Sequence, residues 1–240
     1  MRQSGAMKLL FPKGRPWLEA VMVNTAGGIT GGDRFSVTAS AASGSKLTLT
    51  TQAAERAYRA QPGETARLET RLAAEDGAAL HWLPQETILY DACRYTRSLR
   101  ADLEQGARFL MVEPLVFGRT GMGETLTRGL FRDRIDIRRG GRRLFFDSTR
   151  LEGDIAATLS RSATGGGAAA MACLLLVAPD AETHLNALRD ALPGTGGATM
   201  LHPDVLYLRL LAEDSFEMRK TLLPVLDHLT GNGLPLAWRL

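Results

Sequence analysis

The segment Asn24-Thr-Ala-Gly-Gly-Ile-Thr-Gly-Gly-Asp-Arg-Phe35 requires an unusual backbone. Its two Gly-Gly pairs separate an apolar run that ends at Val23 from an alternating run that begins at Phe35. Glycine adopts a positive φ or lets another part of the chain approach closely, at an entropic cost that an ordinary loop avoids. The segment predicts a tight turn between two strands, with Asp33 as a lone carboxylate at the mouth of the second strand.

A phosphate-binding loop is disfavoured for the same segment. Such a loop would end in Gly-Lys-Ser/Thr and lead into a helix. Here Gly31-Gly-Asp-Arg34 runs into a β-type alternation of Phe35, Val37 and Ala39. The sequence therefore gives no support to a nucleotide site.

Composition places the chain among ordinary globular proteins. Its 240 residues are 45% hydrophobic and 23% charged, enough for one large β-rich domain or two modest ones. The net charge of +3 indicates no field strong enough to favour nucleic acid or a membrane. Cys93 and Cys173 are isolated, and the longest apolar run, 168–178, is too short for a bilayer. These features predict a cytoplasmic protein without a disulfide framework, with a buried, inert thiol at Cys93 and no nucleic-acid or membrane partner.

A repeated unit dominates residues 35–147. Each copy has an alternating strand, a glycine-bearing turn and a returning strand that opens Gly-x-x-Φ-x-Φ, where Φ is apolar. The copies open at Gly44, Gly77, Gly106 and Gly141, with spacings of 33, 29 and 35 residues. This periodicity predicts stacked antiparallel β-hairpins in a mainly β fold.

The returning strands end in polar residues, and stacking in register would align those ends along one edge. We therefore expect Glu86, Glu113 and Asp147 to share one neighbourhood. Other carboxylates also lie at the ends of predicted strands or turns. Burying a carboxylate is costly unless it is paired or faces a cation. The six that follow strands or turns are Asp33, Glu86, Asp91, Glu113, Glu124 and Asp147. For any one of them, capping a turn or pairing with an arginine remains the alternative.

The chain after residue 168 follows a different pattern, which predicts a β-α-β-α tail covering one end of the stack. Strands are expected at 171–177 and 205–211, and a first helix opens after Pro179-Asp180. Asp214 and Glu217 form a capping box for a second helix, with Pro224 inside it and Gly231 as its stop. We expect a β stack over about 1–165 and the helical tail over about 168–240 of one domain.

The chain resembles the UreD family of urease accessory proteins, called UreH in some lineages. The resemblance is carried by motifs spread in the family's order over nearly the whole chain. They are Asn24-Thr-Ala-Gly-Gly-Ile-Thr-Gly-Gly-Asp33, Thr50-Thr-Gln-Ala-Ala-Glu-Arg-Ala-Tyr-Arg59, Trp82-Leu-Pro-Gln-Glu-Thr-Ile-Leu-Tyr-Asp91, Gly118-Arg-Thr-Gly-Met-Gly-Glu124 and Leu234-Pro-Leu-Ala-Trp-Arg239. Further N-terminal strands of the family are expected to be missing here.

The resemblance implies a β-helix-like stack with two helices and no enzymatic activity. It also implies a maturation factor that binds apo-urease and, with UreF and the GTPase UreG, delivers nickel to the urease active site. A homodimer within the accessory complex is a further option. Nickel would pass in transit through a polar interior, with no tightly bound cofactor. Carried over to this chain, the expected nickel-path residues are Asp33, Glu55, Glu113 and Asp147, with Glu86 and Glu124 as weaker additions.

Two other functions stay open from the residues alone. A hydrolase or transferase could use Glu86 and Asp91, and a deep apolar pocket with one carboxylate of raised pKa would favour it. A pure docking module would use its carboxylates only in turns. The basic cluster from Arg132 to Arg143 has interleaved acids and no aromatic ladder, so it predicts a solvated strand face.

Overall fold

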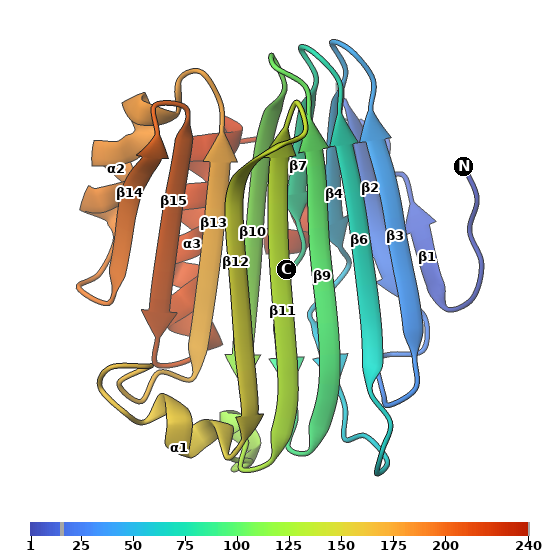
Figure 1. The fold of residues 1–240 in the computed structure, drawn as a ribbon, viewed down its shortest axis with the longest axis vertical. Coiled ribbons are helices and arrows are strands. Elements are labelled where there is room, and N and C mark those ends of the chain that lie inside the picture. The colour runs from blue at the N-terminus through green and yellow to red at the C-terminus, as the bar shows by residue number, and fades with distance from the viewer. Residues whose placement is uncertain (15–16, 240) are drawn as a thin grey trace.

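The computed structural model describes residues 1–14 and 17–239 and shows two facing β-sheets, with helices on the outer side of one of them (Figure 1). Within these residues, ten strands form sheet A and five form sheet B. Sheet A contains β1 (Met7–Leu10), β2 (Leu18–Asn24), β4 (Lys46–Thr51), β5 (Glu55–Ala57), β7 (Ala79–Leu83), β8 (Thr87–Leu89), β10 (Arg108–Phe117), β13 (Ala170–Val177), β14 (Gly196–His202) and β15 (Val205–Ala212). Sheet B contains β3 (Arg34–Ala41), β6 (Ala66–Ala74), β9 (Cys93–Leu103), β11 (Gly129–Arg139) and β12 (Arg142–Gly153).

The chain winds as a β-solenoid, in which successive strands alternate between sheet A and sheet B. Strands β2, β4, β7 and β10 lie side by side and parallel in sheet A. Strands β3, β6, β9 and β11 do the same in sheet B. The predicted mainly β, β-helix-like stack is therefore confirmed.

The pairing inside each repeat differs from a hairpin. β3 runs in sheet B, whereas the returning β4 runs in sheet A, so each strand pairs with its equivalent in the next coil instead of with its own partner. A hairpin and a solenoid coil produce the same alternation and the same glycine turns, which is why the sequence did not separate them. The fourth copy is a true hairpin, because β12 returns antiparallel to β11 within sheet B.

The glycine-rich segment carries the chain from β2 in sheet A to β3 in sheet B. Gly27 and Gly32 adopt φ values of 77° and 84°, which favour glycine. Gly28 and Gly31 instead allow close approach. A Cβ atom at Gly28 would lie 2.8 Å from the Arg56 carbonyl oxygen, and one at Gly31 would lie 2.8 Å from the Glu64 Cβ. The predicted turn is confirmed. In each Gly-Gly pair, one glycine adopts the positive φ and the other allows the close approach of another segment.

Three apolar clusters hold the layers together. Two lie between the sheets, one containing Trp82 and Phe109 and the other containing Tyr95 and Phe131. The third lies between the outer face of sheet A and the C-terminal helices and includes Trp238. The space where the two inner clusters meet is where the candidate site lies.

The C-terminal tail extends sheet A and covers its outer face. β13 pairs antiparallel with β10, and β15 and β14 follow at the edge. Asp214 caps the helix as predicted, since its side chain accepts a hydrogen bond from the Glu217 amide, and Gly231 ends the helix in the left-handed conformation. The Glu217 carboxylate pairs with Lys220, so the cap is one-sided and not the predicted reciprocal box. Strand β14 and helix α1 were not predicted. The helices are α1 (Ile155–Leu159), α2 (Leu185–Ala191) and α3 (Ser215–Thr230), with short 3-10 turns η1 (Thr120–Met122), η2 (Ala181–His184) and η3 (Leu236–Arg239).

No helix in the described part of the chain is long and apolar enough to cross a membrane.

Candidate functional site

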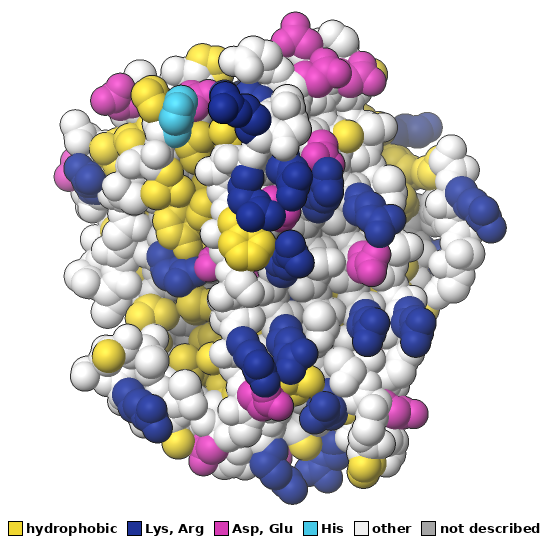
Figure 2. All heavy atoms as spheres, in the orientation of Figure 1, with side chains coloured by type: hydrophobic (Ala, Val, Ile, Leu, Met, Phe, Trp, Pro, Cys, Tyr) yellow, Lys and Arg dark blue, Asp and Glu magenta, His cyan; other side chains and the backbone are white. Residues whose placement is uncertain are grey.

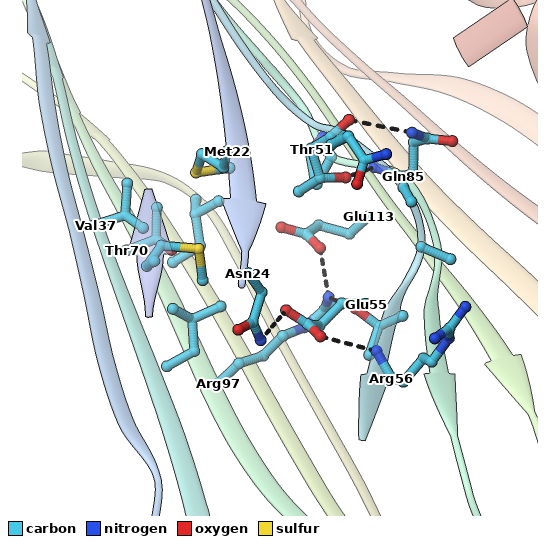
Figure 3. A pocket seen from close by; sticks show the side chains of 18 of the residues that line it. Met22, Asn24, Val37, Thr51, Glu55, Arg56, Thr70, Gln85, Arg97 and Glu113 are labelled. Carbon is cyan, nitrogen blue, oxygen red and sulfur yellow. Dashed lines mark hydrogen bonds and ion pairs between the residues drawn. The ribbon is translucent and has the colours of Figure 1, made fainter. Parts of the chain in front are cut away.

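A cavity of about 170 Å³ lies between the two sheets, and its mainly apolar lining contains a small group of charged side chains (Figure 3). Both sheets line it: Trp82 and Glu113 come from sheet A, and Thr70, Arg97 and Asp133 come from sheet B. Its rim includes the exposed residues 52 and 53, which follow β4. One water molecule needs about 10–15 Å³ of such space, so the cavity has room for several waters or a hydrated ion.

Arg97 bridges two carboxylates in the wall of this cavity. Its Nη1 atom lies 2.6 Å from Glu113 Oε2, and its Nη2 atom lies 2.7 Å from Asp133 Oδ2. The second oxygen of Glu113 accepts a hydrogen bond from Trp82 Nε1 at 2.7 Å. Each of the three charged side chains is less than a tenth exposed. The cluster therefore holds two buried acids against one cation.

Burial raises the pKa of Glu113, and the neighbouring Arg97 charge and the Trp82 hydrogen bond oppose that rise. The charge of Asp133 acts in the same direction as burial, because a nearby like charge disfavours ionisation of Glu113. Burial also disfavours the charged form of Arg97, but Asp133 and Glu113 outweigh it and raise the pKa of the guanidinium. Arg97 thus keeps its charge, and Glu113 is the group of the cluster that can take up or release a proton.

Glu55 lies nearer the surface and lines the same cavity. Its Oε2 atom accepts a hydrogen bond from Asn24 Nδ2 at 3.1 Å, and its Oε1 atom accepts one from the Arg56 amide at 2.9 Å (Figure 3). Asn24 also donates to the Gly28 carbonyl, so the glycine-rich segment positions the carboxylate. Burial raises the pKa of Glu55, and these hydrogen bonds partly offset it.

Glu55, Glu113 and Asp133 line a single cavity, in which both oxygens of Glu113 and one of Asp133 are held by Arg97 or Trp82. Carboxylate oxygen is a hard ligand, and raised pKa values make protons compete with a cation for it. Within residues 1–14 and 17–239, no three side chains of His, Cys, Asp or Glu are arranged so that they could hold a metal ion together. The arrangement can admit a divalent cation and exchange protons with it.

Three of the other predicted carboxylates lie outside the cavity, each paired with an arginine. Glu86 accepts from Arg219 of α3 at 2.8 Å, and Asp147 pairs with Arg209. Glu124 pairs with Arg119 and accepts a hydrogen bond from the Asp91 amide. The expectation that Glu86, Glu113 and Asp147 share one neighbourhood is wrong. Glu86 faces the helix layer, and Asp147 lies on β12, which belongs to sheet B instead of continuing sheet A.

Asp33 caps the glycine turn. Its Oδ2 atom accepts a hydrogen bond from the Thr30 amide at 2.8 Å. It does not line the cavity, although its charge adds a small contribution to the raised pKa of Glu55, after burial. Of the six residues predicted for a nickel path, the structure brings only Glu55 and Glu113 into one cavity.

Sequence reasoning missed Arg97 and Asp133. Arg97 falls between Tyr95 and Leu99 on the inward-facing parity of β9, and Asp133 falls between Phe131 and Ile135 on the inward parity of β11. A charged residue on the apolar parity of a strand is the signal that would have found both. Asp133 was instead assigned to the solvated basic cluster.

The residues of the enzymatic alternative do not form a catalytic pair. Glu86 is held by Arg219, whereas Asp91 accepts hydrogen bonds from Thr127 and from the Arg128 amide. Burial acts to raise the pKa of Asp91, but the bonds from Arg128 and Thr127 outweigh it and the pKa is lowered. Cys93 is also unsuited to nucleophilic chemistry, since burial raises the pKa of its thiol to about 12.

Comparison with known proteins gives one consistent family. The family model described as "UreD urease accessory protein" matches residues 1–238. A urease accessory protein UreD of Roseobacter denitrificans is 54% identical over 240 residues, covering all of this chain and 88% of that protein. A UreD of a Ruegeria species is 55% identical over 248 residues, covering all of this chain and 84% of its own length. A UreD of Ruegeria pomeroyi is 52% identical over 98% of this chain and 92% of its own.

Proposed function

The chain belongs to the UreD urease accessory protein family, and from this premise we propose that it binds apo-urease together with UreF and UreG and passes nickel to the urease active site. Its part in urease maturation is that of a non-enzymatic chaperone in nickel metallocentre assembly. We also propose that the protein is cytoplasmic, that it forms a homodimer within the accessory complex, and that nickel passes through it in transit.

The observation that carries the proposal is the cavity between the sheets, whose charged lining consists of three carboxylates and the two arginines Arg56 and Arg97. Glu55 lies toward its rim, and Glu113 and Asp133 lie deeper, with Arg97 compensating only one of the two deep charges. A divalent cation entering this space would meet negative charge at both depths. Since Arg97 repels a cation, it keeps the deep carboxylates from becoming a strong site, which suits cargo that must leave again.

Proton exchange supports the same role. Burial raises the pKa values of Glu55 and Glu113, so protons can replace the cation as it moves on. A permanently ionised acid cluster in the interior would instead carry a large desolvation cost once the cation had left. The pure docking module remains the alternative, in which this cavity plays no part.

The test is complementation of a urease operon from which its own UreD gene is deleted. Glu55→Gln removes one carboxylate charge from the cavity, and Asp147→Asn removes one from a half-buried pair with Arg209 outside the cavity. We expect Glu55→Gln to lower the nickel content and activity of urease several-fold while UreF, UreG and apo-urease still copurify. Asp147→Asn should behave as wild type. Full nickel content with Glu55→Gln would favour the docking module.

A further inference from the structure

The outer face of sheet B carries a dense array of arginines (Figure 2). On each strand of this sheet, alternate side chains point away from the core, and every strand contributes at least one outward arginine. In the described part of the chain, no helix packs on this face, whereas α2 and α3 cover the outer side of sheet A (Figure 1). The face is therefore a broad, basic and open surface.

One row crosses all five strands. Arg34 of β3 is in register with Arg67 of β6, Arg67 with Thr96 of β9, Thr96 with Arg132 of β11, and Arg132 with Arg150 of β12. With strands about 4.8 Å apart, the row is about 19 Å long. Like charges directly opposite one another destabilise a sheet. Glu152 pairs with Arg150 and lies 3.9 Å from Arg132, which offsets part of this repulsion, and Arg34 lies opposite Arg67 as a pair of like charges.

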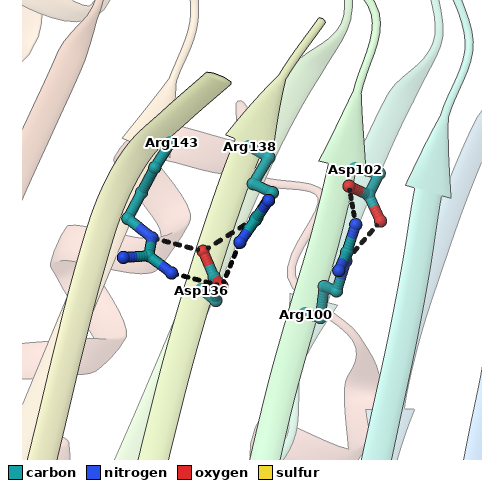
Figure 4. Close-up of polar contacts among 5 residues, drawn as sticks. All are labelled: Arg100, Asp102, Asp136, Arg138 and Arg143. Carbon is teal, nitrogen blue, oxygen red and sulfur yellow. Dashed lines mark hydrogen bonds and ion pairs between the residues drawn. The ribbon is translucent and has the colours of Figure 1, made fainter. Parts of the chain in front are cut away.

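A second group on the same face is ordered by carboxylates. Asp136 accepts from Arg143 at 2.9 and 3.0 Å and from Arg138 at 3.3 and 3.1 Å (Figure 4). On the neighbouring strand Arg100 donates to both oxygens of Asp102 at 2.8 and 2.9 Å (Figure 4). These bonds fix the guanidinium planes before any partner arrives, which lowers the entropic cost of binding.

An exposed aromatic ring lies beside the second group. Phe146 is 43% exposed, and the guanidinium groups of Arg143 and Arg134 lie 4.5 and 5.2 Å from its centroid. Arginine and aromatic residues are enriched in protein interfaces, whereas lysine is depleted. The outward positions of sheet B contain no lysine. The composition matches a protein-binding surface more closely than a merely solvated one.

We propose that the outer face of sheet B docks a partner protein through an acidic surface of that partner. Interleaved Asp102 and Asp136 would repel nucleic-acid phosphates, yet they can pair with scattered basic residues on a mainly acidic protein. The face also lacks the aromatic series on which bases stack. A second copy of this chain is disfavoured there, because two basic faces repel one another. The inference rests on the proposed function for the choice of partners to test.

The test compares two triple variants of the full-length protein. Arg34→Thr/Arg67→Thr/Arg132→Thr removes three of the four arginine charges of the row and replaces them with threonine, the residue that the row already contains at Thr96. Arg2→Thr/Arg59→Thr/Arg161→Thr removes the same charge from exposed arginines elsewhere. Circular dichroism and thermal unfolding establish that both variants fold. Binding to purified apo-urease, UreF and UreG is then measured by calorimetry at several salt concentrations.

We expect the row variant to bind at least one of these proteins tenfold or more weakly, with a shallower salt dependence, and the control variant to stay within twofold of wild type. Unchanged binding of all three proteins by the row variant would overturn the docking face while leaving the proposed function intact. Wild-type protein that binds none of them would contradict the proposed function and the docking face with it. Tighter binding of a 20-base-pair DNA duplex, lost in the row variant, would overturn the protein-partner assignment.

Discussion

Arg97 and Glu113 form an ion pair in the interior between the two sheets, with 2.6 Å between Nη1 and Oε2. They come from opposite sheets, so the pair joins the two walls of the solenoid across the cavity. Because Asp133 shares the same guanidinium, loss of Arg97 would leave two acids buried without a cation.

We predict that Arg97→Met destabilises the fold by about 3–5 kcal/mol at pH 7, the cost of removing one partner from a buried pair. Methionine keeps most of the packing of the arginine stem, so the loss reports mainly the uncompensated acids. Urea unfolding measures it. Arg71→Ala, which breaks an exposed pair with Glu69, is the control and should cost about 1 kcal/mol or less. A loss below 1 kcal/mol for Arg97→Met would show that the cluster contributes little to stability.

The stability of the wild type should fall relative to Glu55→Gln as pH rises. Burial raises the pKa of Glu55 above 4.5, so the folded protein holds this proton more tightly than the unfolded chain does. The stabilisation from that proton is full below pH 4.5 and is lost as pH rises through the folded pKa. Glutamine does not titrate. Urea unfolding between pH 4 and pH 7 should show the free energy of unfolding of Glu55→Gln rising relative to wild type, and a flat or falling difference would refute the raised pKa.

Gly28→Ala should destabilise the turn between β2 and β3. The added Cβ would lie against the Tyr58 ring and 2.8 Å from the Arg56 carbonyl oxygen, which is backbone and cannot move freely. We expect a loss of about 1–3 kcal/mol, typical of overpacking, measured as a lower melting temperature. Gly194→Ala adds a methyl group where no atom lies within 4 Å and should change stability by less than about 0.5 kcal/mol. Equal effects of the two substitutions would argue against a tightly packed turn.

Much of the fold could be predicted because its signals are local. The glycine pairs specify the turn, Asp214 and Glu217 specify the start of α3, and the Gly-x-x-Φ repeat specifies the coils. The pairing of the strands could not be predicted from local sequence. Parallel neighbours in a solenoid are separated by about 30 residues of sequence, and the alternation of apolar residues is the same whether a strand pairs with its own return or with the next coil.

The site was only partly predictable for a related reason. Glu55 and Glu113 were identified from the sequence. Arg97, whose charge compensates the buried Glu113, was not, because it comes from the opposite sheet. Of the carboxylates outside the cavity, Asp33 caps a turn, whereas Asp147 in the middle of β12 pairs with Arg209, which is distant in sequence. Which acids turn inward depends on strand parity together with the sheet that each strand joins, and the second of these is a tertiary property.

The most direct test of the central claim is to fill the cavity without changing its charge. Thr70 is buried on the inner face of β6 and lines the cavity, so Thr70→Phe would occupy the space that a hydrated cation needs. Thr199→Phe, on the exposed side of strand β14, is the matched control. The measurement is nickel per urease active site, by mass spectrometry, after maturation in cells that carry each variant. We predict at least a fivefold loss with Thr70→Phe while apo-urease still copurifies, and none with Thr199→Phe. Wild-type nickel content with Thr70→Phe would contradict passage through the cavity.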